Sequence, residues 1–215
     1  MNQYLNEDDL KYSQSRRDVG HFVTEYPHRD LWPKSDAIMK WFSIIRTFEF
    51  LVKDNNKKVI DLGSGEAPVC HYISSLGNDV VGVDIKDVNH LVNQSLVKMV
   101  LKDAWLFLDE QEEESVDIFV DSCAVTHFLD YDNPYVGHWT RTFDGVYKAL
   151  KPGGYFIISS DVIPGADSGE FISPQKIIEY GIESGLKLYD EPNYDGESYI
   201  PHENPYPIFH FVFVK

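Results

Sequence analysis

The 215-residue chain carries 35 acidic and 19 basic residues, which gives a formal net charge of −16. A negative charge of this size repels phosphate backbones and anionic membranes, so we expect neither nucleic acid nor a membrane as the partner. The expected partner is a small molecule. The chain is long enough to bury a full core, and its 43% hydrophobic and 25% charged residues are ordinary for a globular protein.

The first 34 residues are polar and show no core pattern, so we expect a loop or a short helix there. They lack the apolar stretch of a signal peptide, and the 2 cysteines, Cys70 and Cys123, do not make a secreted disulfide framework, so we expect a cytoplasmic protein. Ser35 fits the N-cap of a helix whose apolar side chains recur at helical spacing. These side chains are Ile38, Trp41, Phe42, Ile45, Phe48 and Val52.

After residue 55 the pattern changes to an alternation of strands and helices. Strands are predicted at 58–62, 79–85, 96–104, 115–123, 155–161, 185–191 and 208–215. Helices are predicted at about 67–76, 135–150 and 174–184, with a turn at 151–154 and a loop rich in Pro and Tyr between the last two strands. Strands that are apolar on both faces and alternate with helices indicate an α/β fold with a parallel sheet, and the last two strands should pair antiparallel because no helix separates them.

The stretch "VIDLGSGEAPVC", residues 59–70, predicts a glycine-rich turn between a strand and a helix. Such turns bind nucleotides, and in an open parallel sheet the ligand lies at the carboxyl ends of the strands. The groups expected there are the Gly63–Gly65 turn, Asp84, Asp103, Asp121 and Asp161. A dinucleotide site is weakened because Pro68 stands at the third glycine position, and a phosphate-binding loop is excluded because no Lys follows Gly65.

Five segments in order resemble the class I S-adenosylmethionine-dependent methyltransferases over about residues 56–215. "VIDLGSGEA" is similar to motif I, with Ala67 in place of the last glycine, and "VVGVDI" is similar to motif II. "LKDAWLF", "VDIFVDSCAVTHF" and "ALKPGGYFIISS" resemble the adenine-binding segment, motif IV and the turn before strand five. The resemblance implies a seven-stranded, mostly parallel sheet of order 3-2-1-4-5-7-6 with strand 7 antiparallel and helices on both faces. It also implies two units, an N-terminal helical or coil lid over 1–55 and a methyltransferase domain over 56–215.

The same resemblance implies a cofactor site for S-adenosyl-L-methionine. Asp61, Gly63, Ser64 and Gly65 would lie at its amino-acid portion, where a glycine turn lets the backbone approach closely. Asp84 would accept hydrogen bonds from the ribose hydroxyls with Ile85 beside it, and Asp103, Ala104 and Trp105 would meet the adenine. Asp103 also fits an N-cap of the following helix, and Asp121 would complete the cofactor-binding set.

The methyl acceptor is expected beyond strands four and five, where His127 is the leading candidate for a general base. Asp121 and Asp161 are further catalytic candidates, and His21, Tyr26, His28, Trp32 and His127 are candidates for the acceptor pocket. No metal is expected, because the Asp-Asn pair of the catechol-type enzymes is missing after strand five. "DNPY", residues 132–135, has one proline where amino-methylating nucleic-acid enzymes have two, and we interpret it as a turn with Pro134 at the first helical position.

The expected reaction is therefore methyl transfer to a small polar acceptor, most simply a hydroxyl of a sugar or another metabolite. The alternatives are N-methylation of a small amine, a nucleotide-binding module without catalysis, and an NAD oxidoreductase. The sequence leaves the oligomeric state open.

Overall fold

The computed structural model describes residues 37–65, 67–87, 89, 94–128, 138–166, 171–197 and 207–215. In this part of the chain eight strands form one sheet in the order β3-β2-β1-β4-β5-β8-β6, and β7 also pairs with β8. The strands are β1 (Lys58–Leu62), β2 (Asp79–Asp84), β3 (Lys98–Leu101), β4 (Val116–Ser122), β5 (Leu150–Asp161), β6 (Lys187–Leu188), β7 (Asn193–Glu197) and β8 (Pro207–Val214).

The predicted strand order is confirmed, with β8 and β6 as the expected seventh and sixth strands. Strands β1 to β5 pair in parallel, and β8 pairs antiparallel with β5, β6 and β7. Strand β7 lies in what we expected to be a loop. Its sequence, NYDGE, contains Asn, Asp and Gly, which are poor strand formers, so the strand arises from pairing with β8 and not from local preference.

Three strands differ clearly from the prediction in their bounds, and one of them, β6, spans only Lys187–Leu188 of the predicted 185–191. The strand expected over 96–104 is limited to β3 (Lys98–Leu101), because Asp103 already caps the next helix. The turn expected at 151–154 lies inside β5 as an irregularity of the β4–β5 ladder. There the pairing passes from Val116 with Leu150 to Ile118 with Tyr155, and Gly153 takes a φ of +78°.

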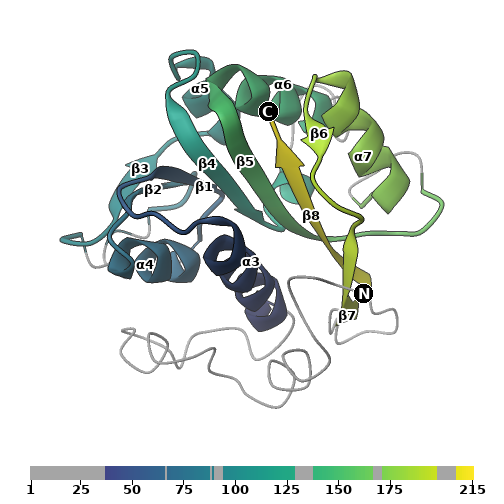
Figure 1. Ribbon diagram of the computed structural model, residues 1–215, viewed down its shortest axis with the longest axis horizontal. Coiled ribbons are helices and arrows are strands. Elements are labelled where there is room, and N and C mark those ends of the chain that lie inside the picture. The colour runs from purple at the N-terminus through teal and green to yellow at the C-terminus, as the bar shows by residue number, and fades with distance from the viewer. Residues whose placement is uncertain are drawn as a thin grey trace.

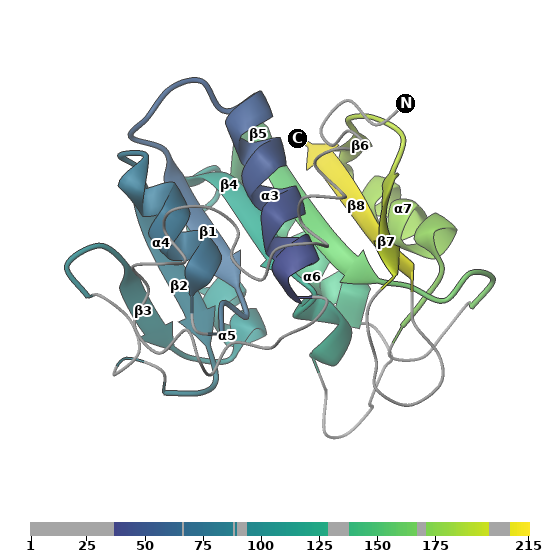
Figure 2. The same cartoon turned by 90° about the horizontal axis from the view of Figure 1, so that it is seen from below.

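Helices cover both faces of the sheet, as predicted (Figures 1 and 2). Helices α3 (Ala37–Leu51) and α4 (Pro68–Ser75) lie on one face, and α5 (Ala104–Asp109), α6 (His138–Ala149) and α7 (Pro174–Glu183) lie on the other. Each face has its own hydrophobic core, one joining Ile44 and Phe48 to the sheet and the other built around Trp139, Phe143 and Phe156. Residues 135–137 of the predicted helix and Pro134 lie outside the described residues, and no described helix is long and apolar enough to span a membrane.

Helix α3 buries more than the stripe that was expected. Ile45 and Phe48 are buried as predicted, and Ile44, Lys40, Ser43 and Thr47 are buried as well. The reason lies in the sheet beneath, where Asp161 of β5 and His210 of β8 present polar groups to this helix. These partners are invisible to an apolar periodicity, which assigns polar side chains to solvent.

One of these polar contacts joins α3 to β8. The Oγ1 atom of Thr47 lies 2.6 Å from Nε2 of His210, and both side chains are buried. Burial disfavours the imidazolium ion and lowers the pKa of His210 to about 3. In mild acid the imidazole therefore stays neutral in the folded protein, whereas the same histidine takes up a proton in the unfolded chain.

This depressed pKa predicts a loss of stability in mild acid. The unfolded chain binds a proton at His210 below about pH 6.5 and the folded chain does not, so the free energy of unfolding falls as the pH is lowered. Replacing His210 with Gln keeps a polar group that can bond to Thr47 but removes the titration. Between pH 7 and pH 5, wild type should lose about 2 kcal/mol more than His210→Gln in urea unfolding. The contributions of all groups that titrate in both proteins cancel in this comparison. Equal losses of unfolding free energy in wild type and His210→Gln would therefore contradict the depressed pKa of His210.

Candidate active site

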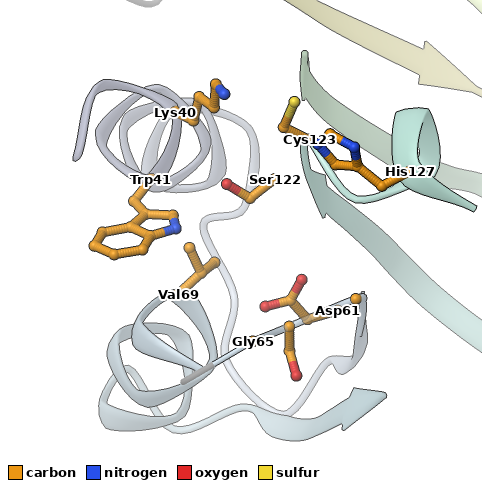
Figure 3. Close-up of a pocket in the computed structure, with 10 residues that line it drawn as sticks. Lys40, Trp41, Asp61, Gly65, Val69, Ser122, Cys123 and His127 are labelled. Atoms are coloured by element: carbon orange, nitrogen blue, oxygen red, sulfur yellow. The ribbon is translucent and has the colours of Figure 1, made fainter. Parts of the chain in front are cut away.

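A cavity of about 320 Å³ opens where β1 and β4 end beneath α3. Figure 3 shows Lys40 and Trp41 on the α3 side and Ser122, Cys123 and His127 on the β4 side. Asp61 of β1 and Val69 of α4 are also labelled there. The full lining is Lys40, Trp41, Asp61, Gly63, Ser64, Gly65, Val69, Ser122, Cys123 and His127. The cavity thus joins the glycine turn, the segment after β4 and the helix that precedes β1.

The glycine turn takes the backbone shape that its residues suggest. Gly63 and Gly65 have φ angles of 68° and 54°, in the left-handed region that glycine adopts without cost. A Cβ atom on Gly63 would lie 2.2 Å from Cβ of Ala124, so only glycine fits between the turn and the segment after β4. A Cβ on Gly65 would meet nothing within 4 Å. Ala67 also has a positive φ, 60°, and so keeps the glycine-like conformation at the position of the motif's last glycine.

Asp84 is bonded to this turn. Its Oδ2 atom accepts a hydrogen bond of 2.9 Å from the backbone N–H of Gly65, and Oδ1 accepts one of 2.8 Å from that of Lys86. The carboxylate therefore ties the end of β2 to the end of β1. The next residue, Ile85, is 68% exposed, so its side chain is accessible to a ligand at the end of β2.

Asp103 is the N-cap of α5, the alternative that the sequence left open. Its Oδ1 atom accepts from the backbone N–H groups of Trp105 and Leu106 at 2.9 and 3.1 Å. Ala104 is buried behind it. The indole N–H of Trp105 donates to Oγ1 of Thr142 at 3.0 Å, so this ring is held against α6.

Asp61 and Asp121 end neighbouring strands and are both buried. The thiol of Cys70 donates to Oδ2 of Asp61, and the backbone N–H groups of Ala124 and Val125 donate to Oδ1 of Asp121. Among the described residues, Oδ1 of Asp61 and Oδ2 of Asp121 have no hydrogen-bond partner. Burial raises the pKa of each carboxyl to about 7. Each is therefore a buried acid with a vacant acceptor atom, which indicates a ligand that brings a donor or a positive charge.

Asp161 forms an ion pair that the sequence analysis missed. The ammonium of Lys40 donates to its Oδ2 atom at 2.7 Å, and the thiol of Cys123 lies 3.2 Å from the same oxygen. The side chains of Lys40 and Asp161 are only 7% and 6% exposed. A signal for Lys40 was present, since Lys40, Ile44, Thr47 and Phe48 repeat at the spacing of one helix face.

His127 is exposed and lines the cavity from the short 3-10 helix η3 (Val125–His127). Its ring packs edge-on against Phe171, with 5.7 Å between the ring centroids. Cys123, just before this helix, has a φ of 62°, a conformation that non-glycine residues adopt at a cost and that recurs at functional sites. The predicted pocket residues His21, Tyr26, His28 and Trp32 lie outside the described residues. Within the described part of the chain, no group of three or more His, Cys, Asp or Glu side chains could hold a metal ion.

A scan against protein-family models matches residues 53–179 to a family described as a methyltransferase domain. The chain belongs to this family. The match includes the glycine turn, Asp84, Asp103, Asp121, His127 and Asp161, so every described residue of the predicted site falls within it, whereas the cavity residues Lys40 and Trp41 lie before it. Together with the five motifs in order, it identifies the chain as a class I methyltransferase that uses S-adenosylmethionine.

Solved structures with the same fold have low sequence identity to this methyltransferase. A TehB-like S-adenosylmethionine-dependent methyltransferase from Corynebacterium glutamicum has a TM-score of 0.59 at 19% identity, covering 97% of this chain and 98% of that one. The 1,6-didemethyltoxoflavin-N1-methyltransferase of Burkholderia thailandensis, with bound 1,6-didemethyltoxoflavin and S-adenosylhomocysteine, has a TM-score of 0.64 at 16% sequence identity. The match covers 100% of this chain and 93% of that one. The [4+2]-cyclase SpnF has a TM-score of 0.63 at 12% sequence identity, and the match covers 80% of each chain. A search of curated protein sequences found no match.

The residues of this methyltransferase fit its cofactor. The vacant Oδ1 atom of Asp61 is an acceptor for an ammonium group, and the open side of Gly65 leaves room for a ligand against the backbone. Asp84 keeps acceptor capacity for hydroxyl donors, because each of its oxygens has two lone pairs and accepts one backbone bond.

We predict that Asp84→Asn weakens binding of both S-adenosylmethionine and S-adenosylhomocysteine by about 1 to 3 kcal/mol, because it removes charge-assisted hydrogen bonds. Isothermal titration calorimetry measures both affinities, and NAD should show no binding to either protein. Asp79→Asn is the matched control, since this exposed acid begins the same strand and lies away from the site. Wild-type affinity in Asp84→Asn would remove this residue from the ribose.

Proposed function

We propose that this methyltransferase acts on a hydroxyl of a small polar acceptor, such as a sugar or another metabolite. The observation that carries the proposal is the position of His127, an exposed imidazole on the wall of the cavity that also holds the glycine turn. S-adenosylmethionine supplies the methyl group, which moves from the sulfonium sulfur to the acceptor oxygen. Nε2 or Nδ1 of His127 takes the hydroxyl proton as the carbon–oxygen bond forms, and a neutral thioether leaves.

Asp121 supports this role of His127 by positioning it. Its carboxylate accepts two backbone N–H groups at the start of the segment that becomes η3, so it fixes the direction in which the chain leaves β4. Asp161 acts through Lys40 and Cys123, which both line the cavity. We keep the predicted division into an N-terminal extension over 1–55 and a domain over 56–215. Helix α3 is then the part of the extension that forms one wall of the site, and His21, Tyr26, His28 and Trp32 are proposed to complete the acceptor pocket.

N-methylation of a small amine is the second candidate. It is favoured by the three buried carboxylates at the strand ends, Asp61, Asp121 and Asp161, which would attract a cationic acceptor. Two proteins of the same fold carry names of this kind, the N1-methyltransferase from Burkholderia thailandensis and a sarcosine dimethylglycine methyltransferase from Galdieria sulphuraria. An amine needs a free lone pair and no base at the acceptor atom, so the two candidates differ in what His127 must do.

His127→Ala therefore tests the reaction type. For a hydroxyl acceptor, turnover should fall by roughly a hundredfold or more, while affinity for S-adenosylmethionine stays close to that of wild type. Turnover of wild type should rise with pH as the general base loses its proton, and the variant should lose this rise. The measurement is the rate against pH for both proteins on a panel of hydroxyl and amine metabolites.

Two other outcomes count against the base assignment. If the rise with pH persists in His127→Ala, the acceptor itself titrates and is an amine. If the lost activity tracks lost folded protein in thermal melts, His127 is structural. Normal turnover in a folded variant ends its candidacy.

A second prediction concerns metal. Turnover should survive an excess of a chelator such as EDTA, because the expected ligand pattern after β5 is incomplete and the sequence there reads SSDVIPG. Loss of activity in chelator followed by rescue with Mg²⁺ would instead make Asp121 and Asp161 candidate ligands.

A further inference from the structure

The buried charges around the cavity do not balance. Asp61, Asp121 and Asp161 are 2%, 0% and 5% exposed, and they end the adjacent strands β1, β4 and β5. Lys40, 6% exposed, is the one buried cation that the described residues place against them. Charges this deep are screened weakly by water, so an uncompensated carboxylate acts strongly on any charge placed in the cavity.

Lys40 acts on more than its direct partner. It donates to Asp161 at 2.7 Å, and its charge also lowers the pKa of the Asp121 carboxyl and of the Cys123 thiol. The pKa of Asp121 still rises to about 7, because the effect of burial exceeds the effect of the lysine. The single ammonium thus offsets only part of the negative charge in this region.

The strand order indicates which part of the cofactor meets these charges. Asp103 follows β3, Asp84 ends β2, and the glycine turn follows β1, so the adenine, the ribose and the amino-acid end would follow one another along the edge of the sheet. The sulfonium sulfur is bonded to the ribose and to the amino-acid chain, so it lies between these two parts of the cofactor. It would therefore lie beside the glycine turn, which lines the cavity together with Asp61, Ser122 and Cys123.

The cofactor and its product differ by one positive charge at that sulfur. We propose that Lys40 sets the preference of the pocket for S-adenosylmethionine over S-adenosylhomocysteine. The carboxylates favour the sulfonium over the neutral thioether, and the ammonium of Lys40 opposes them. This proposal rests on the cofactor and not on the acceptor, so it stands whether the acceptor is a hydroxyl or an amine.

The balance matters for the reaction because the sulfonium loses its charge as the methyl group leaves. A site that holds the sulfonium too strongly stabilises the ground state more than the transition state, which raises the barrier. A site with too little negative charge retains the neutral product. Lys40 is in this view a positioning residue that acts through Asp161 and the neighbouring carboxyls, and it makes no bond to the reacting atoms.

The test uses the two members of one ion pair, whose removal should have opposite effects. Isothermal titration calorimetry at about pH 7.5 gives the dissociation constants of both ligands. Lys40→Met removes the positive charge and should raise the ratio of the S-adenosylhomocysteine to the S-adenosylmethionine constant by about fivefold. This is less than the full Coulombic effect of a unit charge at an effective dielectric of about 20, since the neighbouring acids would take up protons. Asp161→Asn leaves the ammonium unpaired and should lower the same ratio by a similar factor.

Lys40→Arg keeps the charge and is the matched control, with a ratio within about twofold of wild type. A purely structural ion pair would weaken both ligands equally in Lys40→Met and Asp161→Asn, leave the ratio unchanged, and overturn the proposal. Shifts in the same direction in both variants would also overturn it. If Lys40→Met does not fold, Asp161→Asn alone tests the proposal, because the ratio of the two dissociation constants must then fall in that variant. If wild type binds neither ligand, the cofactor assignment itself is refuted. This result is distinct from any change in the ratio of the two dissociation constants.

Discussion

Parallel strands that end side by side bring their terminal side chains into one small region, and in this protein those side chains are acids. Asp61, Asp84, Asp121 and Asp161 end β1, β2, β4 and β5 or lie one residue before the end. Three of them are buried, and burial of several like charges is costly unless each finds a partner. Most of the local structure around the cavity can be understood as the supply of those partners.

The partners are largely backbone N–H groups of the turns that follow the strands. Asp84 accepts from Gly65 and Lys86, and Asp103 accepts from the first turn of α5. Asp121 accepts from the N-cap and the first residue of η3. Each acid therefore shapes a loop and at the same time presents a carboxylate to the site. A structural role and a binding role are not alternatives for such a residue, since one carboxylate has acceptor capacity for both. The exceptions are Asp61, which accepts from the thiol of Cys70, and Asp161, which accepts from the thiol of Cys123 and the ammonium of Lys40 from α3.

This arrangement explains how much could be predicted from the sequence. The strand order, the glycine turn and the acids at the strand ends depend on local patterns. The strand order is as predicted, and the glycine turn and Asp61 line the cavity. Lys40 and the polar stripe of α3 could not be predicted in the same way, because their partners on β5 and β8 lie 121 and 163 residues away along the chain. Strand β7 was missed for a related reason, since a segment with poor strand propensity is held by pairing with β8. Local pattern thus predicted the strand order and the glycine turn, and long-range polar contacts determine the side of the cavity formed by α3.

The two sides also differ in how much freedom the fold leaves them. On the cofactor side, Gly63 fits only as glycine against Ala124, and Ala67 and Cys123 hold left-handed conformations that cost about 1 to 2 kcal/mol each in a non-glycine residue. Backbone held in this way leaves little room for variation. On the acceptor side, Lys40, Trp41 and His127 reach the cavity as side chains from helices, which can be exchanged without moving the turns. A [4+2]-cyclase shares this fold, which shows that the sheet does not dictate the reaction. We therefore expect the acceptor of this methyltransferase to be selected by the side chains that α3 and the segment after β4 present to the cavity.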